Sequence, residues 1–400
     1  METVKKDKMF TTVSIGAATV WFSTHCGAGF ASGTQELQYF ANHGWYGTLL
    51  PFLTIFIIAI TYYVGAETAR QTDNWNYHDW AMEAYKPINV LGAVMIEITV
   101  VITTIAASAA CIAAGATLGE QQLGWPPFVG SLAMFLIVLF LSIFGEKVVR
   151  NNAMIMTVAI IIIVIIVLVA GIVKFMPEIK HLFATKYTNP DATKWSVVGA
   201  ANARTPASFG NAFLWALTYA GFQMGIIAAF SSSFKGAKSK RESKGAVIFG
   251  YILNALMLAG VVLLIFGGMP EVYTNEEARV LPTLYMVGQL DMPILSVAYP
   301  ILLFLALVTT AVGLTFALVE RLNPYVLKNV KRESVRKGII ATVVLLAIWA
   351  VSSLGLMWVV QVAYKYLGIY NWVAIIIPLC TLGYRNIGIR DRAAKESAAG

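Results

Sequence analysis

The sequence predicts an all-α polytopic membrane protein with about ten transmembrane helices. Of its 400 residues, 58% are hydrophobic and only 12% are charged, whereas soluble domains contain about 45–50% apolar and about 25% charged residues. A soluble chain of this length could not cover so much apolar surface with so few charges. The same figures exclude collagen-like and disordered proteins, and the 3 cysteines are too few and too scattered for a disulfide framework.

A helix needs about 20 apolar residues to cross the hydrocarbon core of a bilayer. The sequence offers such runs at 10–40, 46–64, 88–115, 127–144, 153–173, 209–230, 246–268, 294–319, 338–354 and 356–382. They leave no room for a soluble domain, so residues 1–400 are expected to form a single transmembrane domain. Residues 176–208 are expected to be a loop with a short helix, and residues 385–400 a cytoplasmic tail.

Lysine and arginine gather in alternate loops, which is the positive-inside bias of membrane proteins. One side receives Lys5, Lys6, Lys8, Arg70, Lys86, Lys147, Arg150, Lys235, Lys238, Lys240, Arg241, Lys244, Arg321, Lys328, Lys331, Arg332, Arg336 and Lys337. This bias predicts an integral protein of a bacterial cell membrane with both termini in the cytoplasm. Because the net charge of +8 is accounted for by topology, membrane lipid and a small solute are the expected partners, and nucleic acid is not.

Two of the runs carry small residues at mid-span. The first contains Cys-Gly-Ala-Gly-Phe-Ala-Ser-Gly at 26–33, and the sixth contains Tyr-Ala-Gly-Phe-Gln-Met-Gly at 219–225. Five spans in each half, about 10–175 and about 208–384, make the second half enter the membrane from the opposite side. Broken helices at matching places of an inverted repeat mark the central site of a transporter. The alternative is close helix packing, for which small residues are also used.

The segment from Gly27 to Glu36, followed by Tyr39 and Phe40, resembles the first-helix motif of the YkvI-type membrane proteins. These resemble the leucine-transporter fold of the amino acid–polyamine–organocation superfamily. The resemblance implies an inverted-repeat secondary transporter with helices 1 and 6 broken. It also implies short extracellular helices in the loop at 269–292.

The same resemblance implies a sodium site between the first and eighth spans. Its ligands would be the backbone carbonyls of Ser23 and Cys26, together with the carbonyl of Ala306 and the hydroxyls of Thr309 and Thr310. Residues three and four apart share one face of a helix, so the eighth-span ligands would point the same way. The alternative is that both threonines hydrogen-bond back to their own helix. No other cofactor is expected.

Ten residues into the third span, Glu97 is expected near the midplane, where a charge is costly and needs a partner. It could bind a substrate ammonium, carry a coupled proton, or pair with another helix. Backbone amides of the broken segments could meet an anionic group of the solute, and the aromatic rings beside them could form a wall. The expected substrate-binding residues are Gly27, Ala28, Gly29, Phe30, Glu97, Tyr219, Gly221, Phe222 and Gln223.

Three further ionisable residues are candidates for a gate or a proton site. Glu36 in the first span and Lys365 in the tenth could form a charge pair that closes the outer side, although Lys365 could instead extend toward the headgroups. His25 stands directly before the broken segment and could titrate near neutral pH, or it could be a hydrogen-bonded packing residue.

These observations predict a sodium-coupled symporter for an amino acid or related amine that works by alternating access. Proton coupling on the same fold is the first alternative, since His25 or Glu97 could replace the sodium ion. A membrane receptor that binds a ligand without moving it, and a channel, are the others. Zinc-protease, nucleophile-elbow and nucleotide-binding motifs do not occur in the sequence, so an enzyme is not expected.

Overall fold

The computed structural model describes residues 8–25, 27–144, 146–190 and 208–399. Throughout these ranges the chain forms helices joined by turns, with no β-strand. The all-helical fold class is therefore confirmed.

Eight helical segments of the described chain are long and apolar enough to cross a membrane. They are Trp45–Thr72, which contains α4 (Leu50–Thr72); α6 (Asn89–Leu123); α7 (Pro127–Phe144); Phe209–Ser232; α12 (Lys240–Phe266); α16 (Pro293–Leu322); α17 (Glu333–Ser352); and Leu356–Ser397. A ninth candidate is the pair Val158–Lys174 and Met176–Ala184, which is bent by 63°. With the interrupted first run, the set is consistent with ten spans, and the chain is an integral membrane protein.

The first span is interrupted twice and forms α1 (Thr12–His25), α2 (Ala28–Ser32) and α3 (Thr34–Tyr39). The second interruption lies at Gly33, whose φ of +82° is the left-handed conformation that favours glycine. A β-carbon at this position would also collide with the hydroxyl of Thr283. The glycine-rich sequence therefore produces the break that it predicts.

The sixth span is interrupted in a milder way. Its first part, α10 (Phe209–Gln223), begins at the N-cap Ser208, whose hydroxyl accepts a hydrogen bond from the backbone of Asn211. A 3₁₀ turn, η3 (Met224–Ile226), joins α10 to α11 (Ile227–Ser232). The two interrupted spans thus begin the two halves of the chain, as expected.

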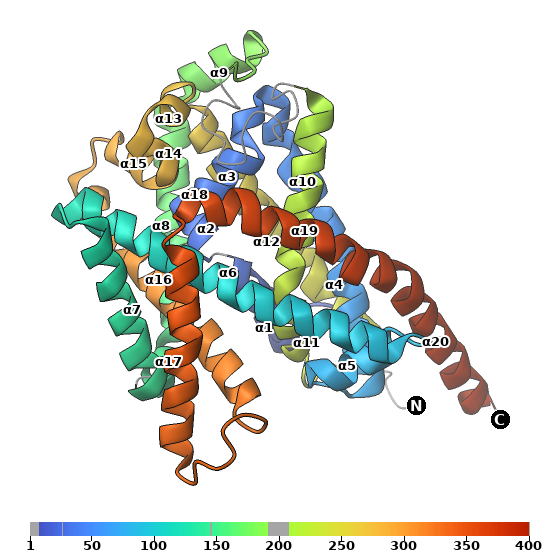
Figure 1. The fold of residues 1–400 in the computed structure, drawn as a ribbon. Coiled ribbons are helices and arrows are strands. Elements are labelled where there is room, and N and C mark those ends of the chain that lie inside the picture. The colour runs from blue at the N-terminus through green and yellow to red at the C-terminus, as the bar shows by residue number, and fades with distance from the viewer. Residues whose placement is uncertain (1–7, 26, 145, 191–207, 400) are drawn as a thin grey trace.

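The long helices pack as two groups (Figure 1). In one, α12 packs against α1 and α4, and α4 packs against α10. In the other, α6, α7, α16 and α17 all contact one another in pairs. The fifth span, α8 (Glu146–Lys174), contacts α16 and α12, and α19 (Tyr364–Asn371) lies along α10. The interrupted first span touches both groups, because α1 packs on α12 while α2 contacts α6 and α16.

Short helices fill the loops between spans. Those of the first half are η1 (Ala41–His43), η2 (Trp45–Leu49), α5 (Tyr77–Ala84) and α9 (Met176–Ala184); those of the second half are α13 (Glu271–Thr274), α14 (Glu276–Val280) and α15 (Pro282–Gly288). The helix expected within 176–208 and the helices expected within 269–292 are therefore both present.

The last span continues as a helix into the segment predicted to be a tail. It comprises α18 (Leu356–Trp358), α19 and α20 (Tyr384–Ala399), joined by the π-helical turns η4 (Val359–Ala363), η5 (Trp372–Ile376) and η6 (Leu379–Gly383). Ion pairs help to hold α20 in place: Arg390 bonds Glu83 at 3.0 Å, and Lys240 bonds Asp391 at 2.6 Å. The hydrogen bond from Lys86 and, to a smaller extent, the one from Arg390 hold the pKa of the Glu83 carboxyl below its ordinary value.

Candidate functional site

The centre of the candidate site is His25, the last residue of α1 before the break. Its Nδ1 lies 2.7 Å from Oδ1 of Asn254 on α12, and its Nε2 lies 2.7 Å from the hydroxyl of Tyr219 on α10. The amide nitrogen of Asn254 donates to the carbonyl of Gly250, so its oxygen is the atom that faces His25. Nδ1 of His25 therefore carries a proton. The imidazole is buried and joins three helices, as the packing alternative describes.

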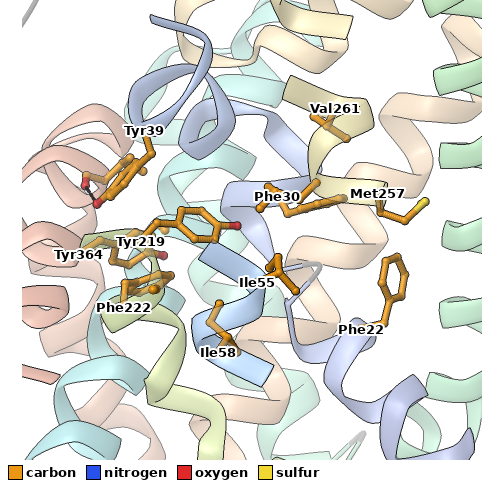
Figure 2. Close-up of a cluster of buried hydrophobic side chains, with 14 of the residues drawn as sticks. Phe22, Phe30, Tyr39, Ile55, Ile58, Tyr219, Phe222, Met257, Val261 and Tyr364 are labelled. Carbon is orange, nitrogen blue, oxygen red and sulfur yellow. Dashed lines mark hydrogen bonds between the residues drawn. The ribbon is translucent and has the colours of Figure 1, made fainter. Parts of the chain in front are cut away.

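Aromatic side chains lie next to this histidine, and Figure 2 shows how several of them gather. The ring of Phe30, on α2, lies 5.4 Å from the imidazole of His25. On α10, Tyr219 contacts the ring of Tyr39, and Phe222 stacks on Tyr364 of α19 with ring centroids 3.8 Å apart. Of the rings predicted to form a wall, Phe30, Tyr219 and Phe222 are thus brought to one region.

Side chains from other helices satisfy the backbone carbonyls at both interrupted spans. The hydroxyl of Tyr299 on α16 donates to the carbonyl of Ala31 at 2.7 Å. In the sixth span, the amide of Asn371 donates to the carbonyl of Gly221 and the hydroxyl of Tyr62 to that of Gln223, both at 2.9 Å. Within a membrane, backbone groups freed from a helix must find partners in the protein, and these three bonds supply them.

The predicted sodium ligands lie where α1 ends against α16. A β-carbon built on Gly27 would lie 3.8 Å from the methyl group of Thr310, so the break and the threonine pair are neighbours. The hydroxyl of Thr309 donates to the carbonyl of Leu305 at 2.8 Å and lies 3.2 Å from that of Ala306. Thr309 therefore makes the bond to its own helix that the alternative describes.

Two other predicted sodium ligands lie in the first span. The hydroxyl of Ser23 donates to the carbonyl of Val20 within α1, while its own carbonyl is the predicted ligand. Cys26 lies outside the described residues.

The glycines of the two breaks have different surroundings. A β-carbon on Gly221 would collide with the carbonyl oxygen of Gly368 on α19, and one on Gly29 would collide with the side chain of Gln35. Close packing therefore accounts for these two glycines. At Gly27, by contrast, the nearest atom other than backbone is the methyl group of Thr310.

Glu97 has its partner on another helix. Its carboxylate forms an ion pair with Arg321 at the end of α16 and accepts a hydrogen bond of 2.8 Å from Tyr77 of α5. The helix that carries it runs from residue 89 to residue 123, so its middle lies near residue 106. At about 1.5 Å per residue, Glu97 is about 13 Å from that middle, toward the loop that contains α5. This contact corresponds to the third predicted role of Glu97, a pair with another helix.

The predicted charge pair between Glu36 and Lys365 is not among the ion pairs of the described residues. The ammonium of Lys365 lies 5.4 Å from the ring centre of Trp215 and 5.8 Å from that of Tyr366, which are cation–π distances. Glu36 is fully buried on α3. Lys365 thus lies against two aromatic rings, and the carboxyl oxygens of Glu36 do not accept a hydrogen bond from it.

Sequence reasoning missed the polar residues Asn254 and Asn371. Each is fully buried within an apolar span and holds a group of the site: Asn254 orients His25, and Asn371 bonds the carbonyl of Gly221. The hydroxyl of Thr99 in turn donates to Asn371 at 2.8 Å. Polar residues in membrane spans are costly and are usually functional, so a search for asparagines within the apolar runs would have found both.

Comparison with solved structures shows that the chain shares the leucine-transporter fold of several solved transporters. A Na⁺-coupled sialic acid symporter in a substrate-bound outward-open state is 13% identical, with a TM-score of 0.59 over 94% of this chain and 78% of that one. MhsT in complex with L-phenylalanine is 16% identical, with a TM-score of 0.55 over 95% and 98%. A manganese transporter of Eremococcus coleocola is 16% identical, with a TM-score of 0.54 over 92% and 78%.

The sequence itself matches no described protein family and no curated protein. At identities of 13–16%, the structural likeness establishes the fold. The expectation of an inverted-repeat fold is thus confirmed.

Proposed function

We propose that the protein is a secondary active transporter that carries an amino acid or related amine together with sodium by alternating access. The fold supports transport, since its solved neighbours include a Na⁺-coupled symporter and a protein in complex with L-phenylalanine. The arrangement of helices also supports it. One group of packed helices contains α1, α4, α10 and α12, and the other contains α6, α7, α16 and α17, so the two groups could rock against each other around the interrupted spans.

Sodium coupling rests on one observation, the contact between the break at Gly27 and Thr310. Hard cations prefer oxygen ligands, which lie about 2.3–2.6 Å from Ca²⁺, for example. To bind a sodium ion beside α16, the hydroxyl of Thr310 would turn toward the break, where its methyl group now lies, and Thr309 would exchange its bond to Leu305 for the ion.

The solute would bind in the aromatic region next to this break. Phe30, Tyr219 and Phe222 are buried in this structure and gather in one region, so a small molecule would meet their apolar and phenolic surface once these side chains separate. An ammonium group could rest on the face of an aromatic ring, because the carboxylate of Glu97 is occupied by Arg321. A carboxylate of the solute would meet the backbone amides that begin α2, near Gly27. A zwitterion therefore fits the chemistry of this region.

Thermal unfolding of the purified protein in detergent tests the sodium site. A ligand that binds only the folded state stabilises it by about 2.7 kcal/mol at 100 times its Kd. We expect sodium chloride to raise the unfolding temperature above that in potassium chloride at equal ionic strength. The double variant Thr309→Ala, Thr310→Ala should lose this difference. Thr381→Ala is the matched control, since Thr381 makes the same bonds to its own helix elsewhere. Equal unfolding temperatures of the unchanged protein in the two salts would remove the site.

A panel of amino acids and amines in the same assay would identify the cargo, and uptake into proteoliposomes would separate a transporter from a receptor. The second candidate is proton coupling, which is favoured by the hydrogen bond between His25 and Tyr219 at the break. Stabilisation by a solute that depends on pH and not on sodium would support that candidate.

A further inference from the structure

The chain contains a buried carboxyl group that the proposed sodium and solute sites do not use. Glu36 lies on α3, and its side chain is 0% exposed. Neither carboxyl oxygen has a hydrogen-bond partner within the described residues. An ionised carboxylate removed from water without a partner is so unfavourable that such groups become neutral instead.

Glu67 provides a comparison within the same molecule. Its side chain is equally buried, but both of its oxygens accept hydrogen bonds from Arg70, at 2.6 and 2.9 Å. A buried charge of this kind has its counterion. The environment of Glu36 thus differs from that of Glu67 in the missing cation, and not in burial.

Two polar groups lie next to the Glu36 carboxyl, its own backbone N–H and the hydroxyl of Tyr219, and neither meets the distance and angle of a hydrogen bond. Asn254 accepts from Nδ1 of His25, so Nε2 of the neutral imidazole is an acceptor, and Tyr219 donates its proton to it. The oxygen of Tyr219 then offers lone pairs to Glu36. A carboxylate would be repelled by these lone pairs, whereas a carboxylic acid could donate to them.

Among the described residues, no Lys, Arg or His of the other elements packed against α3 forms an ion pair with this carboxyl. From α14, the guanidinium of Arg279 bonds the carbonyl of Tyr273 at 3.0 Å. From η1, His43 lies against the ring of Trp215, and from α15 the hydroxyl of Tyr285 bonds Glu271. The charged residues of α12 lie at its start, where Glu242 closes a capping box with Ser239. η4 and α2 contain no titratable residue.

We propose that Glu36 is a proton-binding site, occupied by a proton while α3 packs against α10, α12 and η4 as it does here. Separation of α3 from these helices would admit water, and the carboxyl would then release its proton. In the transport cycle proposed above, on which this last step rests, opening at α3 would therefore move or sense a proton. The proton site itself stands on Glu36 and its surroundings alone.

Infrared spectroscopy of the purified protein at neutral pH tests the site, because a protonated carboxyl absorbs at a higher frequency than a carboxylate. We expect the spectrum of the unchanged protein to contain a protonated-carboxyl band that Glu36→Gln removes. Glu67→Gln is the matched control and should leave that band in place. A spectrum of Glu36→Gln with no loss in this band would overturn the proposal.

A second readout covers the case in which Glu36→Gln does not fold. Tyr219→Phe keeps the ring but removes the hydroxyl that faces Glu36, so the protonated-carboxyl band should remain and shift in frequency. An unshifted band would place the protonated carboxyl elsewhere and would contradict the proposal. Neither measurement requires sodium or a solute, so this proposal and the proposed symport can fail independently.

Discussion

At the residue scale, Glu97 demonstrates how far an apolar run predicts the depth of a charge. Counting from the start of the run places it near the midplane, but α6 has 35 residues and spans about 52 Å at about 1.5 Å per residue. This is longer than the hydrocarbon core of about 30 Å, so the place of a residue in the apolar run does not by itself give its depth. The sequence shows that the carboxylate of Glu97 needs a partner. It does not identify that partner, because Arg321 is 224 residues away.

We expect Glu97→Gln to destabilise the protein by about 1–2 kcal/mol. Exposed pairs contribute less than about 1 kcal/mol and breaking buried pairs costs about 3–5 kcal/mol; here the two side chains are 28% and 29% exposed. Denaturation in detergent would measure the loss. In a double-mutant cycle, Arg321→Gln should cost less in the Glu97→Gln background than alone. Glu120→Gln, an exposed position on the same helix, is the control. Additive losses for the pair would contradict a direct interaction.

At the element scale, the sequence predicts where the two spans are interrupted but not which atoms surround each interruption. Small residues at 26–33 and 219–225 locate both breaks, because glycine weakens a helix interior. Whether a glycine faces a ligand or another helix depends on the neighbouring backbone, which no local pattern encodes. Gly27 faces Thr310, whereas Gly221 lies against Gly368. A further local signal went unused: Ser239 and Glu242 have the spacing of a capping box, and α12 begins there.

The contact between α10 and α19 predicts that Gly221→Ala is destabilising. The added methyl group would collide with the carbonyl of Gly368, and backbone cannot move aside as a side chain can. Overpacking of this kind typically costs about 1–3 kcal/mol. The control is Gly210→Ala on the same helix, where a β-carbon meets nothing within 4 Å. Thermal unfolding of both variants would measure the difference, and equal stability would show that the two helices can separate without cost.

At the scale of the whole molecule, apolar length and charge predict the spans, and packing decides which of them meet. α7 matches its predicted run, 127–144, at both ends. The division into two packed groups could not be predicted in this way, because all-apolar faces fit many partners. Both ends of the described chain lie at the start of α12. A β-carbon on Gly245 would collide with the backbone of Met9, and Asp391 binds Lys240. The termini are therefore on one side, as an even number of spans requires.

The positive-inside bias assigns this shared side to the cytoplasm, which labelling of the full-length protein can test. Gly288→Cys would lie in open space at the end of α15, and Ser397→Cys would lie near the end of α20. Three spans separate the two positions, so they should face opposite sides. With the native cysteines replaced by serine, a membrane-impermeant maleimide should label Gly288→Cys on intact cells. Ser397→Cys should react only after the cells are permeabilised.

Each other outcome of this labelling has a definite meaning. The reverse pattern would show that the lysine and arginine bias does not set the orientation of this chain. Labelling of both positions from the same side would require an even number of crossings between them, and α16, α17 and the last span could not then all traverse the membrane. The second half of the chain can repeat the first in inverted form only if an odd number of spans separates matching positions of the two halves. That result would therefore also remove the inverted repeat on which alternating access depends.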